Sequence, residues 1–317
     1  MRTVFFGTPE IAVPTLRAMA ASRFRPLAVF TQPQARRGRG GEAASGPVGS
    51  CARNLGLELH EVESVNEGEP LARLTALAPD VIVVVAFGQI LKKAVLNLPQ
   101  YGCLNFHPSM LPKYRGAAPV QRAVMDGVRH SGLTIMRLVR KLDAGPVLLQ
   151  QPWPLDPSRT AAELLDEAGA LGAPLMLRVL ENLPSLTPLP QDDAAATFAP
   201  PLQKHEGELR FDVSAEALVN RVRAVQPWPK ASALLRAGGR DHRVIVWQAR
   251  VCAGSGAPGA ILGVGADGIS VACAEGAVLL AELQLEGKPR RHARDVANGL
   301  RLGPADRFLN PEPTHGA

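Results

Sequence analysis

Three polar side chains in the first half of the chain have the types and the spacing of an acyl-transfer site: Asn105, His107 and Asp143. Asn105 and His107 are two residues apart in an apolar run, so on a β-strand they point to the same face. An amide can donate a hydrogen bond to a developing oxyanion, and an imidazole can exchange protons near neutral pH. A carboxylate can orient that imidazole and stabilise its charged form. The trio suits attack of an amine on a carbonyl carbon without a covalent enzyme intermediate.

Each residue of the trio, taken singly, has an ordinary structural interpretation that is the favoured one. Asn105 is typical of a strand end, His107 of a satisfied core histidine and Asp143 of a turn before Gly145. Taken together, in this order and with their flanking residues, they favour the catalytic interpretation. No G-x-S-x-G elbow is present, and this chemistry needs no serine or cysteine nucleophile.

The elements that must position these residues alternate along the first half of the chain. The predicted strands cover residues 3–6, 26–30, 81–86, 103–106 and 133–139. The predicted helices cover residues 13–21, 71–77 and 120–126. This alternation predicts an α/β fold with a doubly wound, Rossmann-like parallel sheet. Ligands of such sheets bind outside the carboxyl ends of the strands, which is where Asn105 and His107 fall.

The chain changes character after a proline-rich stretch. Thr160 and Glu163 form a capping box that starts a helix running toward Leu183. Five prolines follow within residues 184–201, and this composition predicts an interdomain linker. Farther on, short apolar runs separated by glycines are typical of a small β-barrel. We expect a catalytic domain at residues 1–189, a linker at residues 190–207 and a C-terminal domain at residues 208–317.

Composition limits the partners and the compartment. The net charge of +6 and the isoelectric point of about 9.4 permit a polyanionic partner without requiring one. The longest apolar run, residues 81–87, is too short to span a bilayer, and the amino terminus has no signal-peptide layout. We therefore expect a cytoplasmic protein that does not bind membranes, and we expect a monomer.

Several cofactors are not indicated. The four cysteines and seven histidines show neither metal-site nor disulfide spacing, so no metal is expected. The first turn contains only Gly7 where a G-x-G-x-x-G fingerprint would stand, which argues against NAD. There is no P-loop to indicate ATP.

The sequence around the trio resembles the signature N-x-H-x-S-L-L-P…D-x-G of the 10-formyltetrahydrofolate-dependent formyltransferases. Residues 111–121 and 6–12 narrow the resemblance to the methionyl-tRNA formyltransferases, and it covers nearly the whole chain. One departure is Met110, where that family usually has leucine, a swap that changes the side-chain volume little. The resemblance implies that the C-terminal barrel is OB-like.

The resemblance also implies an activity: transfer of the formyl group of 10-formyltetrahydrofolate, a co-substrate, to the α-amino group of methionyl initiator tRNA. Asn105 and His107 would stabilise the oxyanion, and His107 and Asp143 would move protons. The resemblance places folate contacts on two segments. They comprise Ser109, Met110, Leu111 and Pro112, and Phe87, Gly88, Gln89 and Ile90. The alternative for the first segment is a rigid loop that only shapes the wall of the site.

Two basic stretches are expected to meet the tRNA. The first holds Arg36, Arg37 and Arg39, and Gly38-Arg39-Gly40 is similar to the G-R-G core of a loop that meets the acceptor end in the family. The residues flanking that core depart from the family's pattern, so the role is carried over to Arg39 first.

The second basic stretch lies in the tail. It contains Lys288, Arg290 and Arg291, which we expect to contact phosphates along the tRNA. Without the resemblance, the first stretch is equally typical of a solvated loop, and for the second a solvated surface is the favoured interpretation by composition alone.

Other functions remain open at this point. A formyltransferase acting on an amino sugar would share the trio but would have no use for the arginines near residue 39. An enzyme acting on glycinamide ribonucleotide would normally end near the first domain. A folate hydrolase would use water as the acceptor, and a catalytically silent RNA-binding module would not need the trio.

Overall fold

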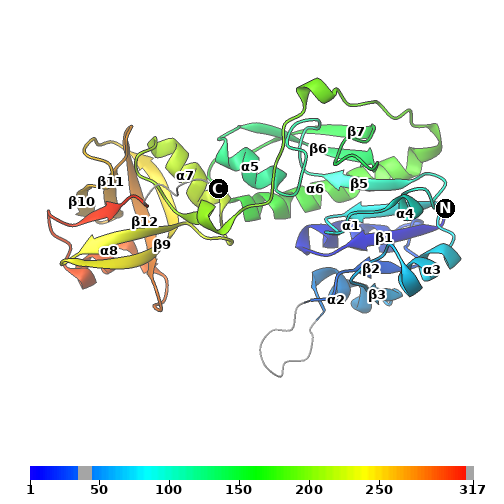
Figure 1. Ribbon diagram of the computed structural model, residues 1–317, viewed down its shortest axis with the longest axis horizontal. Helices are drawn as coiled ribbons and strands as arrows, with labels where there is room; N and C mark the ends of the chain where they lie inside the picture. The colour runs from blue at the N-terminus through cyan, green and yellow to red at the C-terminus, as the bar shows by residue number, and fades with distance from the viewer. Residues whose placement is uncertain (35–44, 312–317) are drawn as a thin grey trace. The chain divides into compact units, whose positions relative to one another are not determined.

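The computed structural model describes residues 1–34 and 45–311. The arginines at positions 36, 37 and 39 lie outside these residues. The chain divides into two units (Figure 1). Unit 1 comprises Met1–Pro119, His130–Pro154 and Leu164–Ala199. Unit 2 comprises Val120–Arg129, Leu155–Glu163 and the described residues from Pro200 onward. Residues 190–199 of the expected linker therefore belong to unit 1, and residues 200–207 to unit 2.

Unit 1 is built on a seven-stranded sheet with the order β3-β2-β1-β4-β5-β6-β7. The strands are β1 (Thr3–Gly7), β2 (Val29–Thr31), β3 (Leu59–Glu61), β4 (Val81–Val85), β5 (Cys103–His107), β6 (His130–Arg137) and β7 (Val147–Pro154). The pairs from β3 to β5 are parallel, whereas β5 with β6 and β6 with β7 are antiparallel. The predicted α/β class is confirmed, and the two pairings at one edge are antiparallel because β6 runs against the other strands.

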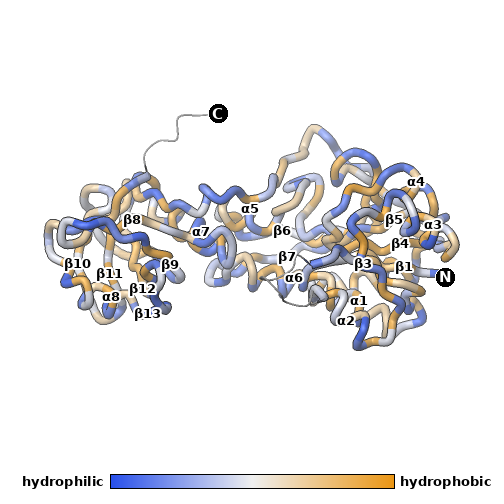
Figure 2. The backbone as a smooth tube through the Cα atoms, turned by 60° about the horizontal axis from the view of Figure 1, so that its bottom comes forward, coloured by the Kyte–Doolittle hydropathy of each residue, from blue (hydrophilic) through white to orange (hydrophobic). Residues whose placement is uncertain are grey.

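The central strands of unit 1 are apolar on both faces because helices cover both sides of such a sheet. All five residues of β1 and of β4 are buried, and Figure 2 shows this region in the hydrophobic colour. The helices are α1 (Val13–Ala20), α2 (Pro47–Asn54), α3 (Gly68–Ala76), α4 (Lys93–Leu96) and α6 (Ala161–Asn182, from Leu164 onward), with 3-10 turns at Glu10–Ala12, Leu183–Ser185 and Asp193–Ala195.

Helix α6 starts at the capping box that the sequence predicts and packs against β5. The Glu163 carboxylate accepts a hydrogen bond from the Thr160 N–H at 2.8 Å, and the Glu163 N–H donates to the Thr160 hydroxyl at 3.3 Å. Farther along, a Cβ on Gly172 would lie 2.6 Å from the ring of Phe106. The absence of a side chain at Gly172 lets α6 approach the strand that carries Asn105 and His107.

Unit 2 contains an antiparallel sheet with the order β10-β11-β12-β9-β8-β14, and β13 pairs with β12. Its strands are β8 (Ser232–Ala237), β9 (Arg240–Cys252), β10 (Ile261–Gly265), β11 (Gly268–Ala272), β12 (Ala277–Leu285), β13 (Arg291–His292) and β14 (Arg307–Leu309). The sheet curls until its edges meet, since the Phe308 N–H donates to the Gly259 carbonyl at 2.8 Å. The predicted small barrel is confirmed.

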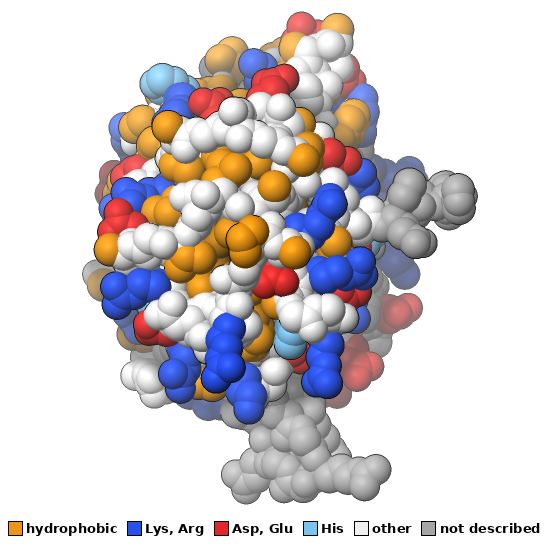
Figure 3. All heavy atoms as spheres, turned by 90° about the vertical axis from the view of Figure 1, so that its left-hand side faces the viewer, with side chains coloured by type: hydrophobic (Ala, Val, Ile, Leu, Met, Phe, Trp, Pro, Cys, Tyr) orange, Lys and Arg blue, Asp and Glu red, His pale blue; other side chains and the backbone are white. Residues whose placement is uncertain are grey.

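The barrel of unit 2 encloses its own apolar core, which includes Phe211, Val246, Leu280 and Phe308. Its helices are α5 (Pro119–Met125, from Val120 onward), α7 (Ala215–Ala224) and α8 (Ala293–Leu300), with a 3-10 turn at Lys204–Gly207. Figure 3 looks onto the end that carries β10, β11 and α8, where Lys and Arg side chains lie mainly along the lower edge of a face with a hydrophobic centre. Among the described helices, none combines the length and the apolar character that crossing a membrane requires.

Candidate active site

Strand β5 brings Asn105 and His107 to the carboxyl end of the sheet of unit 1. Asn105 pairs with Met136 and His107 with Thr134 across the antiparallel β5–β6 ladder. Both side chains lie on one face, as the two-residue spacing predicts. Asn105 is half-buried, and its amide has no hydrogen-bond partner among the described residues. A half-buried amide without a partner inside the protein is available to donate to a substrate oxygen.

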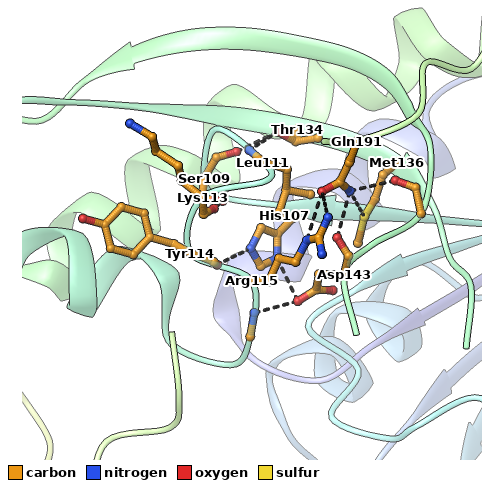
Figure 4. A network of polar contacts seen from close by, with 12 residues as sticks. His107, Ser109, Leu111, Lys113, Tyr114, Arg115, Thr134, Met136, Asp143 and Gln191 are labelled. Carbon is orange, nitrogen blue, oxygen red and sulfur yellow. Dashed lines mark hydrogen bonds and ion pairs between the residues drawn. The ribbon is translucent and has the colours of Figure 1, made fainter. Parts of the chain in front are cut away.

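The ring of His107 is 4% exposed and is held between a carbonyl and a carboxylate (Figure 4). Its Nε2 lies 2.9 Å from the Tyr114 carbonyl oxygen. A carbonyl only accepts hydrogen bonds, so Nε2 must carry the hydrogen and donate it. The other ring nitrogen, Nδ1, lies 3.7 Å from Oδ2 of Asp143. Nδ1 is therefore the nitrogen of His107 that can take up or release a proton.

Asp143 lies in a tight turn that requires a left-handed backbone at Asp143 and a glycine at position 145. Its φ is +44°, and its Oδ2 accepts a hydrogen bond from the Gly116 N–H at 2.8 Å. Two residues later, a Cβ on Gly145 would lie 1.7 Å from the Arg137 carbonyl oxygen. Glycine is thus required at position 145 for the turn to pass β6, and this places the Asp143 carboxylate beside His107. The structure brings the three predicted catalytic residues into one region.

The predicted folate residues of the loop after β5 point mainly inward. Ser109 is fully buried, and its hydroxyl donates to the Lys113 carbonyl at 2.6 Å. Leu111 is 3% exposed, and the Met110 side chain packs so closely on Gly132 that a Cβ there would lie 2.6 Å from the Met110 methyl. Pro112 is half-buried, and its carbonyl accepts a hydrogen bond from the Thr197 N–H. These side chains shape and stiffen the loop.

The second predicted folate segment follows β4 and presents backbone with one exposed side chain. Phe87 is 2% exposed and packs on Phe6. Gly88 has a φ of +81°, and the Gln89 amide is bonded to the backbone of Val62 and Val65. Ile90, by contrast, is 88% exposed.

Two residues of this site were not predicted from the sequence. The Gln191 amide donates to the carbonyls of Asp143 and Gly145, and it accepts from the guanidinium of Arg115. Arg115 is 1% exposed and also pairs with Asp193 at 2.7 Å. Hydrogen bonds from Lys141 and then Arg115 hold the pKa of Asp193 below its ordinary value. Arg115 lies within residues 111–121, which carry the family resemblance, and that was a possible signal for it. Gln191 lies in the stretch that was expected to be a linker, so no signal pointed to it.

The predicted tRNA contacts in the tail lie on the surface of unit 2. Lys288, Arg290 and Arg291 are all exposed. Arg290 forms an ion pair with Glu282, and its guanidinium carbon lies 5.1 Å from the centre of the Trp247 ring. Arg290 and Trp247 line a groove of about 870 Å³. In the described ranges, no group of three or more His, Cys, Asp or Glu side chains could hold a metal ion.

Comparison with known proteins gives the same assignment over both units. Residues 1–180 match the family model described as formyl transferase, and residues 201–301 match that described as formyl transferase, C-terminal domain. The chain is 42% identical over 306 residues to a methionyl-tRNA formyltransferase of Citrifermentans bemidjiense, covering 96% of this chain and 95% of the relative. It is 44% identical over 308 residues to that of Thermus thermophilus, covering 97% and 99%.

Solved structures share the fold at low sequence identity. A methionyl-tRNA formyltransferase from Clostridium thermocellum has a TM-score of 0.57 at 16% identity, over 80% of this chain and 94% of that one. An N-formyltransferase from Helicobacter canadensis, in complex with folinic acid and dTDP-3-aminofucose, has a TM-score of 0.64 at 15% identity, over 88% and 98%. These likenesses concern the fold alone.

Proposed function

The chain belongs to the methionyl-tRNA formyltransferase family, and from this premise we propose how its residues transfer a formyl group from 10-formyltetrahydrofolate to the α-amino group of methionyl initiator tRNA. The product, formylmethionyl-tRNA, serves translation initiation. One observation carries the mechanism. The Asn105 amide, without a partner among the described residues, lies beside the His107–Asp143 pair at the carboxyl end of β5.

The mechanism rests on Asn105, His107 and Asp143. When bound, 10-formyltetrahydrofolate supplies the formyl carbon that the α-amine attacks. The Asn105 amide donates a hydrogen bond to the formyl oxygen as negative charge develops there, and His107 stabilises the same charge. Because Nε2 of His107 is committed to the Tyr114 carbonyl, Nδ1 takes up the proton that the attacking amine loses, and the Asp143 carboxylate 3.7 Å away stabilises the charged ring. The bond between the formyl carbon and N10 breaks, and the proton passes to N10 as tetrahydrofolate leaves. No side chain forms a bond to the formyl group.

We place the folate between the two segments that the family resemblance indicates. Gly88 has no side chain, Ile90 is 88% exposed, and the buried Phe87 anchors the turn to the core by packing on Phe6. Ser109, Met110, Leu111 and Pro112 hold the opposite loop in shape, as their burial and their bonds to the loop's own backbone suggest. In this proposal the backbone and Ile90 contact the co-substrate, and the buried side chains act through the loop.

We propose that residues 208–317 form the tRNA-binding domain and that the groove around Arg290 receives tRNA phosphates. Arg129 and Arg223 line the same groove. Burial, and then the charge of Arg129, hold the pKa of Arg223 below its ordinary value. The Arg223 guanidinium donates to the Asn220 amide oxygen and the Arg159 carbonyl, so the exposed Arg129 is the arginine of this pair that is placed to meet a phosphate. The exposed Lys288 and Arg291 extend the basic surface. From the sequence, Arg39, with Arg36 and Arg37, is assigned to the acceptor end.

An amino-sugar acceptor is the alternative substrate. A sugar N-formyltransferase shares the fold, but at 15% identity, against 42% and 44% with the methionyl-tRNA formyltransferases. The difference in identity favours the tRNA. We further propose that the enzyme acts in the cytoplasm as a monomer.

The test is transfer of labelled formyl from 10-formyltetrahydrofolate to methionyl initiator tRNA, with methionyl elongator tRNA as the matched control. Formylation of the initiator alone is expected. Equal formylation of both tRNAs would reject the initiator specificity. Loss of formyl without transfer would point to a hydrolase, and transfer only to an amino sugar would establish the alternative.

A further inference from the structure

The segment of residues 189–199 lies against both loops that shape the active site of unit 1. The Val147 and Leu189 N–H groups donate to each other's carbonyls, at 2.7 and 2.8 Å. Farther along, the Arg115 N–H donates to the Thr197 carbonyl at 2.9 Å, and the Ala199 N–H donates to the Arg115 carbonyl at 2.7 Å. The segment is therefore bonded at one end to the strand after Asp143 and at the other end to the loop after His107.

Gln191 lies on this segment and faces the turn of Asp143 (Figure 4). Its Nε2 donates to the Asp143 carbonyl at 2.8 Å and to the Gly145 carbonyl at 2.7 Å. Its Oε1 accepts from Nη2 and Nε of Arg115, at 2.8 and 3.1 Å. Carbonyls only accept and a guanidinium only donates, so the two ends of the amide cannot be exchanged. Both amide hydrogens and the amide oxygen are fully used.

These contacts act on the backbone that aims the Asp143 carboxylate. Asp143 has a φ of +44°, a conformation that residues with side chains rarely adopt. The two hydrogen bonds from Gln191 hold the carbonyls on either side of Ala144 and so fix this turn. Arg115 in addition holds the Gln191 side chain in place, because the Arg115 guanidinium is itself buried (1% exposed) and paired with Asp193.

We propose that Gln191 is a positioning residue for the formyl transfer, which acts by holding the Asp143 carboxylate beside His107. The proposal rests on the role given to Asp143 above. Glutamine is suited to this place because the side chain must donate twice and accept from a cation. Glutamate keeps the acceptor for Arg115 but has no hydrogen to donate to the carbonyls, and methionine keeps the shape without either function.

The experiment measures kcat and both KM values of Gln191→Met and Gln191→Glu with 10-formyltetrahydrofolate and methionyl initiator tRNA. We expect kcat to fall roughly 10- to 100-fold in each, because small displacements of a reacting group cost rates of that order. Both KM values should stay within about twofold, since the Gln191 amide is occupied by Asp143, Gly145 and Arg115 and acts on the substrates only through them. The matched control is Asp192→Ala, whose side chain, among the described residues, accepts from the Ala194 N–H of its own segment alone. It should keep the wild-type kcat.

A double mutant separates positioning from general support of the fold. If Gln191 acts through Asp143, then Gln191→Met should lower kcat by less than about twofold in an Asp143→Asn background. The same loss in both backgrounds, an unchanged kcat, or a loss in KM alone would overturn the proposal. Circular dichroism checks that the variants fold. If Gln191→Met does not fold, the kcat of Gln191→Glu is used to test the proposal instead. If neither variant folds, Gln191 is structural and the proposal is wrong.

Other failures can be told apart from this one. A wild-type enzyme that does not formylate methionyl initiator tRNA would reject the proposed function. A fully active Asp143→Asn variant would reject the role of Asp143, and with it the positioning by Gln191. The Gln191 variants test the positioning role only if the wild type formylates methionyl initiator tRNA and Asp143→Asn loses activity.

Discussion

The active-site edge of unit 1 and the groove of unit 2 hold their polar side chains in opposite ways. At the edge, His107, Arg115 and Gln191 are buried or half-buried, and each is bonded to a partner of fixed geometry. In the groove, Arg250 and Arg290 are exposed and pair with surface carboxylates, although Arg223 at its wall is buried and bonded to the Arg159 carbonyl. Buried networks fix positions to a fraction of an ångström, whereas exposed charges act over distance and are screened by salt. Under the proposed function, this difference suits unit 1 to chemistry and the exposed arginines of unit 2 to attraction of tRNA.

This contrast predicts different kinetic consequences. Changes at the edge of unit 1 should lower kcat and leave KM nearly unchanged. Changes in the groove should raise KM for tRNA and leave kcat nearly unchanged. A variant at the edge of unit 1 that changes KM alone, or a groove variant that changes kcat alone, would contradict this contrast.

The largest effect is expected from Asn105→Ala. Loss of an oxyanion donor typically lowers kcat by about 10²- to 10³-fold, and KM for tRNA should change by less than about threefold. Steady-state formylation kinetics measure both values. The control is Asn182→Ala, where the amide donates only to the Arg178 carbonyl at the end of α6. A large rise in KM for tRNA, with kcat kept, would show that Asn105 binds rather than stabilises the transition state.

The next effect is expected from Gly145→Ala. The new Cβ would meet the Arg137 carbonyl at 1.7 Å, so the turn must move and carry Asp143 with it. Overpacking of this kind destabilises by about 1–3 kcal/mol, and we expect kcat to fall at least about tenfold. Gly299→Ala is the control, because nothing lies within 4 Å of its Cβ position in α8 and alanine favours helices. Calorimetry and kinetics together test this, and a stable, active Gly145→Ala would show that the turn tolerates displacement.

The sequence indicated that Asn105, His107 and Asp143 belong to one site because much of the signal is local; their catalytic role stays a prediction. Asn105 and His107 share one strand, and Gly145 marks the turn that brings Asp143 to them. The central strands were also predictable, since β1 and β4 are continuous apolar runs. The second predicted strand began too early, at residue 26, and β2 starts at Val29.

What the sequence did not reveal depends on contacts between distant residues. Strand β7 contains Pro152 and Pro154, which argue against a strand unless it lies at an edge, as β7 does. Gln191 bonds to residues 48 and 76 positions away, inside a stretch whose prolines predict a linker. No local pattern distinguishes a linker from a segment that closes an active site.

A smaller effect is expected from Arg290→Ala in the groove of unit 2. If Arg290 contacts a phosphate, KM for tRNA should rise about two- to fivefold, and the salt dependence of binding should lose about one unit of slope. The control is Arg236→Ala, another exposed arginine with a carboxylate partner, Asp241, which does not line the groove. Titrations at several salt concentrations measure the slope. An unchanged slope would remove Arg290 from the tRNA surface, and a loss in kcat would break the comparison.

The smallest effect concerns the Arg122–Glu206 ion pair, a largely buried pair in unit 2 that positions no reacting group. The two side chains are 17% and 16% exposed and lie 2.5 Å apart. Hydrogen bonding from Arg122 lowers the pKa of Glu206 below its ordinary value of 4.5. The folded state therefore binds that proton less readily than the unfolded chain. The stability contributed is full above pH 4.5 and is lost as the pH falls through the lowered value.

Glu206→Gln should remove this contribution, roughly 1 kcal/mol or about 2–4 °C in melting temperature, at pH 7. The difference from the wild type should shrink as the pH falls below about 4.5, because the unfolded wild-type chain then binds the proton, and it should vanish once the folded carboxylate is protonated at its lowered pKa. At pH 7 the variant should keep its kcat. That outcome would show that kcat is sensitive in unit 1 because the buried groups there position Asp143 and His107, and not merely because they are buried. A tenfold loss of kcat in Glu206→Gln would mean that any buried polar pair supports catalysis, and the distinction between the two units would fail.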